Sequence, residues 1–543
     1  MPQITAASDK VKAAIAAWDP TSISNDLKDL QTPTPPEVII TSEARTPIFD
    51  PTLGISVPRP QGDAPNRLVA IGDSLTHGFQ SDAIFNTDWS YPAVIARELG
   101  WYDSFRHPEY IGFGGLPLNI EFLVREIEQR FGAAINWWQL GSAVFFVYGI
   151  LSQIRNYWEH GAGANVPTTA GIMHNLAVSG YDVRDVISRT ADFERQSMTT
   201  PTDPLLKPMV QNAGELMALY VLNSAVSNNQ SLSPVQAAAA LGQQGIETLT
   251  IFIGANNALR TVVDLALHWS QAPDYSDLAK KSAFNIWNPL HFASEYDELA
   301  SAVWDVNAQH VIWCTVPHVT IAPIAHGIGS KVAPGSRYFP YYTRPWIADQ
   351  QFDPTTDQAI TANQARAVDS AIDQYNDGIA AVVEYGRNNG RDWLLLDVAG
   401  LLDRLAARRY LLDPAARPKW WTPYTLPAPV AALSPRPDSQ FFAANMNGRV
   451  QGGLFSLDGV HGTTITYAIL AQEFINVMLG AGVKFLQADG VSARPGPITI
   501  DFAAMIGRDT LISDPPKSLS ADLAWAGWIN ELVDWVKRLG RVL

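Results

Sequence analysis

The sequence predicts an α/β fold in which helices cover both faces of a central, mostly parallel β-sheet. From Arg67 onward, short apolar or β-branched runs alternate with amphipathic or alanine-rich stretches, and this alternation is typical of parallel sheets. Hydrophobic residues make up 47% of the 543 residues and charged residues only 17%, which provides material for a large core. We expect about five strands, at residues 67–72, 172–178, 247–253, 309–316 and 392–397.

Helices are expected between these strands and after the last of them. Amphipathic or alanine-rich patterns span residues 211–228, 234–243 and 359–388, and an apolar stretch spans 465–479. With helices on both faces of the sheet, the predicted architecture is a three-layer sandwich. Ligands of such sheets bind beyond the carboxyl ends of the strands, so polar residues that directly follow a strand are candidates for function.

Ser74 follows the first predicted strand, within the stretch Ile71-Gly72-Asp73-Ser74-Leu75-Thr76-His77. A serine at the tip of a buried strand, with glycine two residues before it, projects into the cleft at that edge of the sheet, where a nucleophile would be placed. Taken alone, Ser74 could equally be the N-cap of a helix, because serine is a favoured capping residue. Asp73 is interpreted as a stabiliser of the turn and not as an acid in the chemistry.

The stretch Asp458-Gly459-Val460-His461, near the other end of the chain, supplies the groups that a serine nucleophile needs. An aspartate three residues before a histidine in one turn can orient the imidazole, which can then take the serine proton. Ser74, Asp458 and His461 are therefore the candidate catalytic triad. The alternative is that residues 458–461 form an ordinary surface turn.

Two further segments end in residues that could stabilise an oxyanion. Gly180 closes the predicted strand at 172–178, and Asn256 follows the strand at 247–253. The backbone N–H groups of Ser74 and Gly180 and the side-chain amide of Asn256 could supply three donors. Glycine lets a backbone approach closely because it has no Cβ. Gly180 could also simply end its strand, and Asn256 could be a turn residue.

These four segments, in this order, resemble the conserved blocks of the SGNH hydrolases, also called the GDSL family of esterases and lipases. The matching residues are Ser74, Gly180, Asn256 and His461, with Asp458 as the third member of the triad. The resemblance covers roughly residues 67–480, as short blocks separated by long unmatched stretches. The family usually has aspartate after the oxyanion asparagine, whereas this chain has Asn257, which removes a charge but no catalytic group.

The resemblance implies a flavodoxin-like SGNH hydrolase fold and a serine hydrolase that cleaves carboxylic esters through an acyl-enzyme intermediate. Low charge and aromatic-rich insertions favour a lipase or esterase acting on apolar acyl esters, with a small-molecule or lipid ester as its partner. An O-acyltransferase or a carbohydrate acetylesterase would use the same residues. A catalytically silent lipid- or glycan-binding module is a further alternative, against which the intact set of three triad residues weighs.

Composition and motifs exclude several other classes of function. The net charge of −15 argues against a nucleic-acid partner. No phosphate-binding loop and no metal-ligand spacing occur, so neither a cofactor nor a metal is expected. His318 follows a predicted strand and could touch a substrate, although a lone loop histidine is more often structural. Cys314 is the only cysteine, which rules out an intrachain disulfide.

The first twenty residues lack the basic start and apolar run of a signal peptide, so a cytoplasmic location is expected. An exported form whose leader had been removed would look the same, which leaves this alternative open. Residues 1–66 are expected to form an N-terminal helix and a proline-rich arm, and residues 67–485 the catalytic domain. Residues 486–543 read as a C-terminal extension ending in an amphipathic helix with an apolar stripe from Trp525 to Leu539.

Three insertions are expected in the catalytic domain, at about 101–170, 326–356 and 410–455. The first contains an uncharged, apolar stretch at 136–154, which is interpreted as a buried helix or, alternatively, as a lid or lipid-contact element. The other two are rich in aromatic residues. These aromatics could line a pocket on the active face or form the small cores of their own loops. The sequence leaves the oligomeric state open.

Overall fold

Four parallel strands form the central sheet, in the order β1–β7–β8–β12. A computed structural model of the chain describes residues 2–29, 33–60, 62, 64–132, 137–201, 210–487 and 489–517. The four strands are β1 (Asn66–Gly72), β7 (Ile246–Phe252), β8 (Ala308–Cys314) and β12 (Trp393–Leu396). Their side chains are buried almost throughout, as in sheets covered on both faces.

The fifth predicted strand, at residues 172–178, is not a regular strand. This segment runs parallel to β1 through hydrogen bonds from Ala70 N to His174 O (2.9 Å), Leu176 N to Ala70 O (2.8 Å) and Val178 N to Gly72 O (3.2 Å). The side-chain oxygen of Asn175 accepts the N–H of Ala177, a local bond that competes with ladder pairing. The expected strand position is therefore correct, but the sheet proper has four strands.

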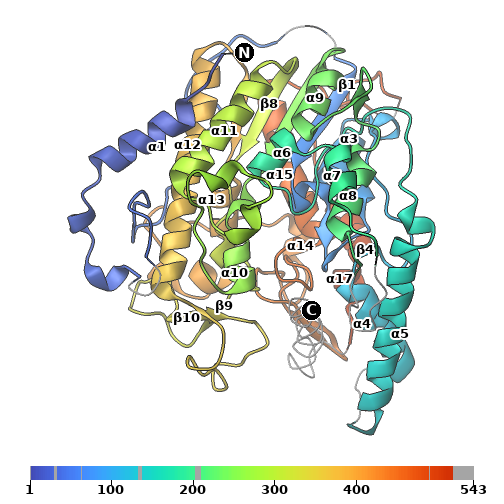
Figure 1. The fold of residues 1–543 in the computed structure, drawn as a ribbon, viewed down its shortest axis with the longest axis vertical. Helices are drawn as coiled ribbons and strands as arrows, with labels where there is room; N and C mark the ends of the chain where they lie inside the picture. The colour runs from blue at the N-terminus through green and yellow to red at the C-terminus, as the bar shows by residue number, and fades with distance from the viewer. Residues whose placement is uncertain are drawn as a thin grey trace.

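Helices cover the sheet on both faces (Figure 1). One group comprises α9 (Pro234–Gly242), α11 (Pro289–Trp304) and α12 (Ala362–Asn388), and the other comprises α3 (Tyr91–Glu98) and α15 (Thr464–Ala481). Helices α9 and α3 both pack against β1, and α12 and α15 both pack against β12. The predicted α/β class with a parallel central sheet is thereby confirmed.

The predicted helices at 234–243, 359–388 and 465–479 match α9, α12 and α15 closely. The predicted helix at 211–228 is shorter and ends at Leu222 as α8 (Ala213–Leu222). Asn228 and Asn229 have positive φ angles of 50° and 61° and turn the chain into the small hairpin of β5 (Val226–Ser227) and β6 (Gln230–Ser231). Asparagine tolerates this backbone region, which suits the turn between β5 and β6.

The N-terminal segment lies on the outside of α11 and α12 (Figure 1). Its helix, α1 (Ala6–Ala17), begins where the Asp297 carboxylate of α11 accepts the N–H groups of Ala7 (2.8 Å) and Ser8 (2.9 Å). A carboxylate at this end satisfies otherwise unpaired donors and complements the helix dipole. The proline-containing arm then runs along α12 and reaches β12, where Leu395 N donates to Pro51 O (2.9 Å).

The first insertion adds one strand to a small antiparallel sheet that follows α2. The strands β2 (Phe79–Gln80) and β3 (Ala83–Ile84) precede the insertion, which contributes β4 (Leu116–Pro117) and the helices α4 (Ile120–Phe131) and α5 (Leu140–Glu159). Helix α5 packs against α4 and extends past the rest of the chain at the right of Figure 1. The insertion thus carries a projecting helical element.

Helix α5 is buried on one face only. Leu151 and Trp158 are 2% and 0% exposed, whereas Trp138, just before the helix, and Phe145 are 64% and 81% exposed. The interpretation of residues 136–154 as a buried helix therefore holds for one face of α5 only, because the other face lies at the molecular edge. Among the described residues, α15 is the one helix long and apolar enough to span a membrane, and core packing explains its composition because 61% of that span is buried.

The two later insertions form small structures of their own. The second contains the antiparallel strands β9 (His326–Ile328) and β10 (Tyr341–Thr343), to which β11 (Ile360–Thr361) is added. The third contains the hairpin of β13 (Ala443–Asn445) and β14 (Gly448–Gln451). In the C-terminal extension, α16 (Phe502–Arg508) and α17 (Thr510–Ser513) follow, while the predicted helix at 525–539 lies outside the described residues.

Candidate active site

Ser74 is the first residue of α2 (Ser74–His77), a single helical turn that directly follows β1. Asp73 is its N-cap, and its Oδ1 accepts the N–H of Leu75 (3.1 Å). A Cβ at Gly72 would lie 2.1 Å from the Oγ1 of Thr76 and 2.7 Å from a backbone oxygen of β7, so only glycine permits this close turn. The sharp strand-to-helix turn places Ser74 beyond the carboxyl end of β1.

His461 connects Ser74 to Asp458 by direct contacts. Its Nε2 lies 2.8 Å from Ser74 Oγ, and its Nδ1 lies 3.0 Å from Asp458 Oδ2. The ring also packs against Phe79 of β2, with centroids 4.6 Å apart. An ionised Asp458 requires Nδ1 to carry the proton, which leaves the Nε2 lone pair facing the serine hydroxyl. This arrangement suits a general base for Ser74.

The Asp458 carboxylate accepts four N–H groups. Its Oδ1 accepts the backbone N–H groups of Val460 and His461 (2.8 Å each), and its Oδ2 accepts the backbone N–H of Asp82 (2.9 Å) and the His461 ring. Burial by itself would raise the pKa of Asp458, but the charge of His461 and these hydrogen bonds hold the pKa below its ordinary value. The carboxylate is therefore kept ionised.

The Asp82 donor comes from a strained turn between β2 and β3. Ser81 and Asp82 have φ angles of 51° and 63°, a left-handed conformation that costs a residue with a Cβ roughly 1–2 kcal/mol. The turn is tied down because Ser81 N donates to Ser456 Oγ (2.9 Å) and Ile120 N donates to Ser81 O (2.8 Å). Backbone strain is thus found where the turn supports the Asp458 carboxylate.

Gly180 and Asn256 are neighbours beyond the strand ends. Asn256 lies in a short 3₁₀ turn after β7, and its Nδ2 donates to the carbonyl of Tyr181 (2.8 Å), the residue after Gly180. The turn that contains Gly180 also contacts α2, because Ser179 N donates to His77 Nδ1 (3.2 Å). Gly180 has a φ of 82°, which favours glycine. Direct contacts thus join Ser74, His461 and Asp458, whereas Gly180 and Asn256 are linked to each other through Tyr181 and to α2 through Ser179.

The residues beside the predicted site have supporting contacts. Asn257 is fully buried, and its side-chain oxygen accepts the N–H of Val183 (3.3 Å) at the start of α6 (Val183–Ser188). Burial raises the pKa of Asp73 to about 7. Asp73 Oδ2 has no hydrogen-bond partner, so the carboxyl group acts through its capping oxygen alone.

A cavity of about 120 Å³ borders the side chains of Ser74 and His461. It lies between the segment after β8, helix α13 (Val398–Leu405) and α15. Aliphatic side chains form most of its wall, among them Leu75, Ala322, Val398, Leu402, Leu405 and Leu470. Of the aromatic residues in the two later insertions, Phe455 borders this cavity. An apolar cavity next to a nucleophile can hold an apolar group of a substrate.

The other insertion aromatics gather elsewhere. Tyr410 and Trp421 belong to a small core of their own loop. Phe339, Tyr342 and Phe441 line a separate hollow of about 370 Å³. Both earlier interpretations of these aromatics thus apply to some of them, and the cavity beside Ser74 is mainly aliphatic.

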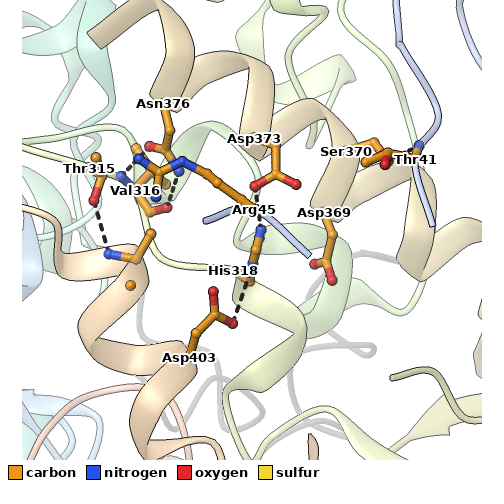
Figure 2. Close-up of polar contacts among 12 residues, drawn as sticks. Thr41, Arg45, Thr315, Val316, His318, Asp369, Ser370, Asp373, Asn376 and Asp403 are labelled. Atoms are coloured by element: carbon orange, nitrogen blue, oxygen red, sulfur yellow. Dashed lines mark hydrogen bonds and ion pairs between the residues drawn. The ribbon is translucent and has the colours of Figure 1, made fainter. Parts of the chain in front are cut away.

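His318 belongs to the wall of the cavity but is fixed by charge (Figure 2). Its Nε2 lies 2.9 Å from Asp373 Oδ1, and its Nδ1 lies 3.5 Å from Asp403 Oδ1. Burial alone would lower the pKa of His318, but the carboxylates of Asp369, Asp373 and Asp403 raise it to about 10. The imidazolium therefore joins helices α12 and α13, and the structural interpretation of this histidine is the better one.

One face of α12 holds the segment that follows β8. Asn376 exchanges two hydrogen bonds with the backbone of Val316, at 2.6 Å and 2.9 Å, next to the His318–Asp373 pair (Figure 2). One turn further, Asp369 accepts from Thr320 (2.5 Å) and Arg409 (2.8 Å). Positions 369, 373 and 376 share a helical face, so a polar stripe on an otherwise apolar face was the sequence signal for this cluster.

Three described side chains could share a metal ion. The ligand atoms of Asp88, His107 and Glu109 lie within 4.8 Å of one another, although two of the three residues are exposed. His107 Nε2 is 3.5 Å from Asp88 Oδ1, so an ion pair accounts for part of the grouping. Such exposed groupings are common without an ion, and no metal is assigned to them.

Sequence reasoning missed Asp82, which donates to the Asp458 carboxylate, and the pair Ser81 and Ser456, which holds the turn that carries Asp82. Ser81 and Asp82 act through their backbone N–H groups, which every residue except proline has, so the residue types gave no signal. No protein-family model matches the chain, and no curated protein matches it significantly.

The ion pairs of His318 give a pH-dependent term in stability. Because the folded pKa is raised, the imidazolium stabilises the fold fully below the unfolded pKa of about 6.5 and loses this effect as the pH rises through about 10. In urea unfolding, the stability difference between wild type and His318→Gln should shrink over this window by up to about 1.4 kcal/mol per pH unit. His160→Gln, at an exposed position, is the control. A difference that stays constant from pH 6 to pH 10 would contradict the assignment.

Proposed function

We propose that this protein is a serine hydrolase that cleaves carboxylic esters through an acyl-enzyme, with the SGNH arrangement of groups. The observation that carries the proposal is the contact chain from Ser74 through His461 to Asp458, at 2.8 Å and 3.0 Å. These groups come from opposite ends of the chain and meet beyond the carboxyl end of the sheet, where α/β folds bind ligands. A surface turn would not require such alignment with a buried serine.

In the proposed reaction, Ser74 Oγ attacks the ester carbonyl while His461 Nε2 takes the hydroxyl proton. Asp458 orients the ring and stabilises its cationic form. The oxyanion of the tetrahedral intermediate is held by the N–H groups of Ser74 and Gly180 and by the amide of Asn256. His461 then gives its proton to the leaving alcohol, and a water activated in the same way releases the acid and restores the serine.

The aliphatic cavity supports esters of apolar acids over acetyl esters. Leu75, Val398 and Leu402 would lose contact with water when an acyl chain enters, and each buried methylene adds about 0.8 kcal/mol. An acetyl group would leave most of this wall uncovered. A carbohydrate acetylesterase is thus less well supported than an esterase or lipase.

The two remaining alternatives differ in what they predict for the intermediate. An O-acyltransferase would form the same acyl-enzyme and pass the acyl group to an alcohol in place of water. A catalytically silent binding module would have no use for an ionised Asp458 held by four N–H groups. Product analysis with an added alcohol distinguishes the transferase, and labelling of Ser74 by a phosphonate distinguishes the binding module.

Ser74 and the length of the acyl chain provide the first test of the proposed function. Hydrolysis of p-nitrophenyl esters from acetate to palmitate should be at least about 10³-fold slower in Ser74→Ala, because the acyl-enzyme cannot form. The wild type should prefer acyl chains longer than acetate, since these fill the aliphatic cavity. Equal activity in both proteins would remove Ser74 from the mechanism. A maximum at acetate would show that the cavity does not bind the acyl group.

The second prediction concerns Asn256. Asn256→Ala should lower kcat by about 10²–10³-fold, the usual effect of losing one oxyanion donor, with a small change in KM. Asn447→Ala, at an exposed loop asparagine, provides the matched control and should keep kcat within twofold. A kcat for Asn256→Ala within a few-fold of wild type would show that this amide does not bind the oxyanion.

The third prediction concerns lipid contact through residues 136–154. The exposed Trp138, just before α5, and Phe145, on α5, lie in an uncharged stretch, which suits the interface of a neutral lipid surface better than an anionic one. The protein should float with phosphatidylcholine vesicles, and the double variant Trp138→Ser, Phe145→Ser should not. Val491→Ser, at an 82% exposed site away from this helix, is the control. Equal flotation of all three proteins, or none by wild type, would contradict lipid contact.

A further inference from the structure

A second buried histidine, His77, lies three residues after the proposed nucleophile, and the reaction above does not use it. It ends α2, and its side chain is fully buried. Its Nδ1 lies 3.2 Å from Ser179 N and 3.3 Å from Ser179 Oγ, and its Nε2 lies 3.0 Å from the hydroxyl of Tyr110. The ring therefore stands between the nucleophile helix and the turn that carries Gly180.

Counting protons fixes the tautomer of this ring. The hydroxyl of Tyr110 donates its single proton to the carbonyl of Met217 (2.9 Å), so towards His77 it can only accept. Burial lowers the pKa of His77 to about 3 and raises the pKa of Tyr110 well above its ordinary value, so both groups are neutral near pH 7. The one ring proton must then sit on Nε2, which leaves Nδ1 as an acceptor for the backbone N–H of Ser179.

The Ser179 bond fixes one end of the turn that contains Gly180. Tyr181 N donates to Val178 O (3.2 Å), and Gly180 has the positive φ that the third residue of a type II turn requires. The far end of the turn is held by Asn256, whose amide donates to Tyr181 O (2.8 Å). With both ends held, the direction of the Gly180 N–H is set relative to α2, and so relative to Ser74.

We propose that His77, kept in its Nε2–H tautomer by Tyr110, is a positioning residue that aims the Gly180 N–H at the oxyanion. The inference rests on the proposed function, since the oxyanion forms only when Ser74 attacks an ester carbonyl. The proposal also implies that loss of the Tyr110 hydroxyl lowers kcat, although Tyr110 belongs to a different segment from Ser74. His77 acts through the turn and does not itself touch the substrate.

The tautomer is tested without any substrate. In ¹⁵N NMR spectra of the full chain, the His77 ring should show a protonated Nε2 and an unprotonated Nδ1 that do not titrate between pH 5 and pH 9. Tyr110→Phe removes the oxygen that accepts from Nε2 and should change the Nε2 shift. A protonated Nδ1 in the wild type would overturn the proposal, because Ser179 N would then have no acceptor.

Turnover tests the positioning. Tyr110→Phe keeps the ring stacked on Tyr220, at a centroid distance of 4.8 Å, and should lower kcat about tenfold with KM within twofold, a partial loss of one oxyanion donor. The matched control is Tyr220→Phe, whose hydroxyl donates to Gly163 O (3.0 Å) and which should keep kcat within twofold. Equal losses in the two variants, or a change confined to KM, would reduce His77 to a structural role.

Substitution of His77 itself completes the test. Asparagine can place an oxygen near the position of Nδ1, so His77→Asn should retain at least tenfold more kcat than His77→Leu, which offers no acceptor. Equal kcat in these two variants would overturn the proposal. Should His77→Leu fail to fold in a thermal melt, Tyr110→Phe and Tyr220→Phe still decide the question. If the wild type hydrolyses no ester, the proposed function fails, whereas the tautomer result stands independently.

Discussion

The arrangement of the site depends on keeping one buried carboxylate, that of Asp458, charged. A buried carboxylate is costly unless hydrogen bonds replace the water that it loses. Here four N–H groups do so, two from the backbone of its own turn, one from the His461 ring and one from Asp82. Because the Asp82 donor arrives on a hairpin from the start of the domain, the turn at 456–461 and the β2–β3 hairpin must form together. The strain at Ser81 and Asp82 is tolerated because these bonds hold the turn.

Two buried histidines beside the cavity show how similar residues serve different purposes. His461 has one nitrogen bonded to a carboxylate and the other facing Ser74, so it has a lone pair to accept a proton. His318 faces a carboxylate with each nitrogen, which keeps both nitrogens protonated and leaves none free to act as a base. The number of carboxylates around a ring, more than its place in the chain, separates a chemical role from a structural one.

Much of the fold was predictable because it depends on local pattern. The four strands of the sheet and helices α9, α12 and α15 lie where apolar runs and helical spacing place them. The segment at 172–178 has the apolar character of a strand, but the Asn175 side chain bonds within the segment. Ser74, Asp458 and His461 were predictable because short motifs surround them. The Asp82 donor and the partners of His318 were not, because distant parts of the chain supply them only after folding.

The arm that reaches β12 covers part of the outer edge of the central sheet. An outer strand of a parallel sheet offers unpaired backbone groups to any other extended chain. Here the N–H of Leu395 is already bonded to the carbonyl of Pro51, and proline has no N–H with which to extend the ladder outward. The arm therefore prevents a further strand from pairing with the sheet next to β12. A shortened chain that begins near β1 would lack the arm, so the outward-facing backbone groups of β12 would be unpaired. Such a chain would self-associate through β12.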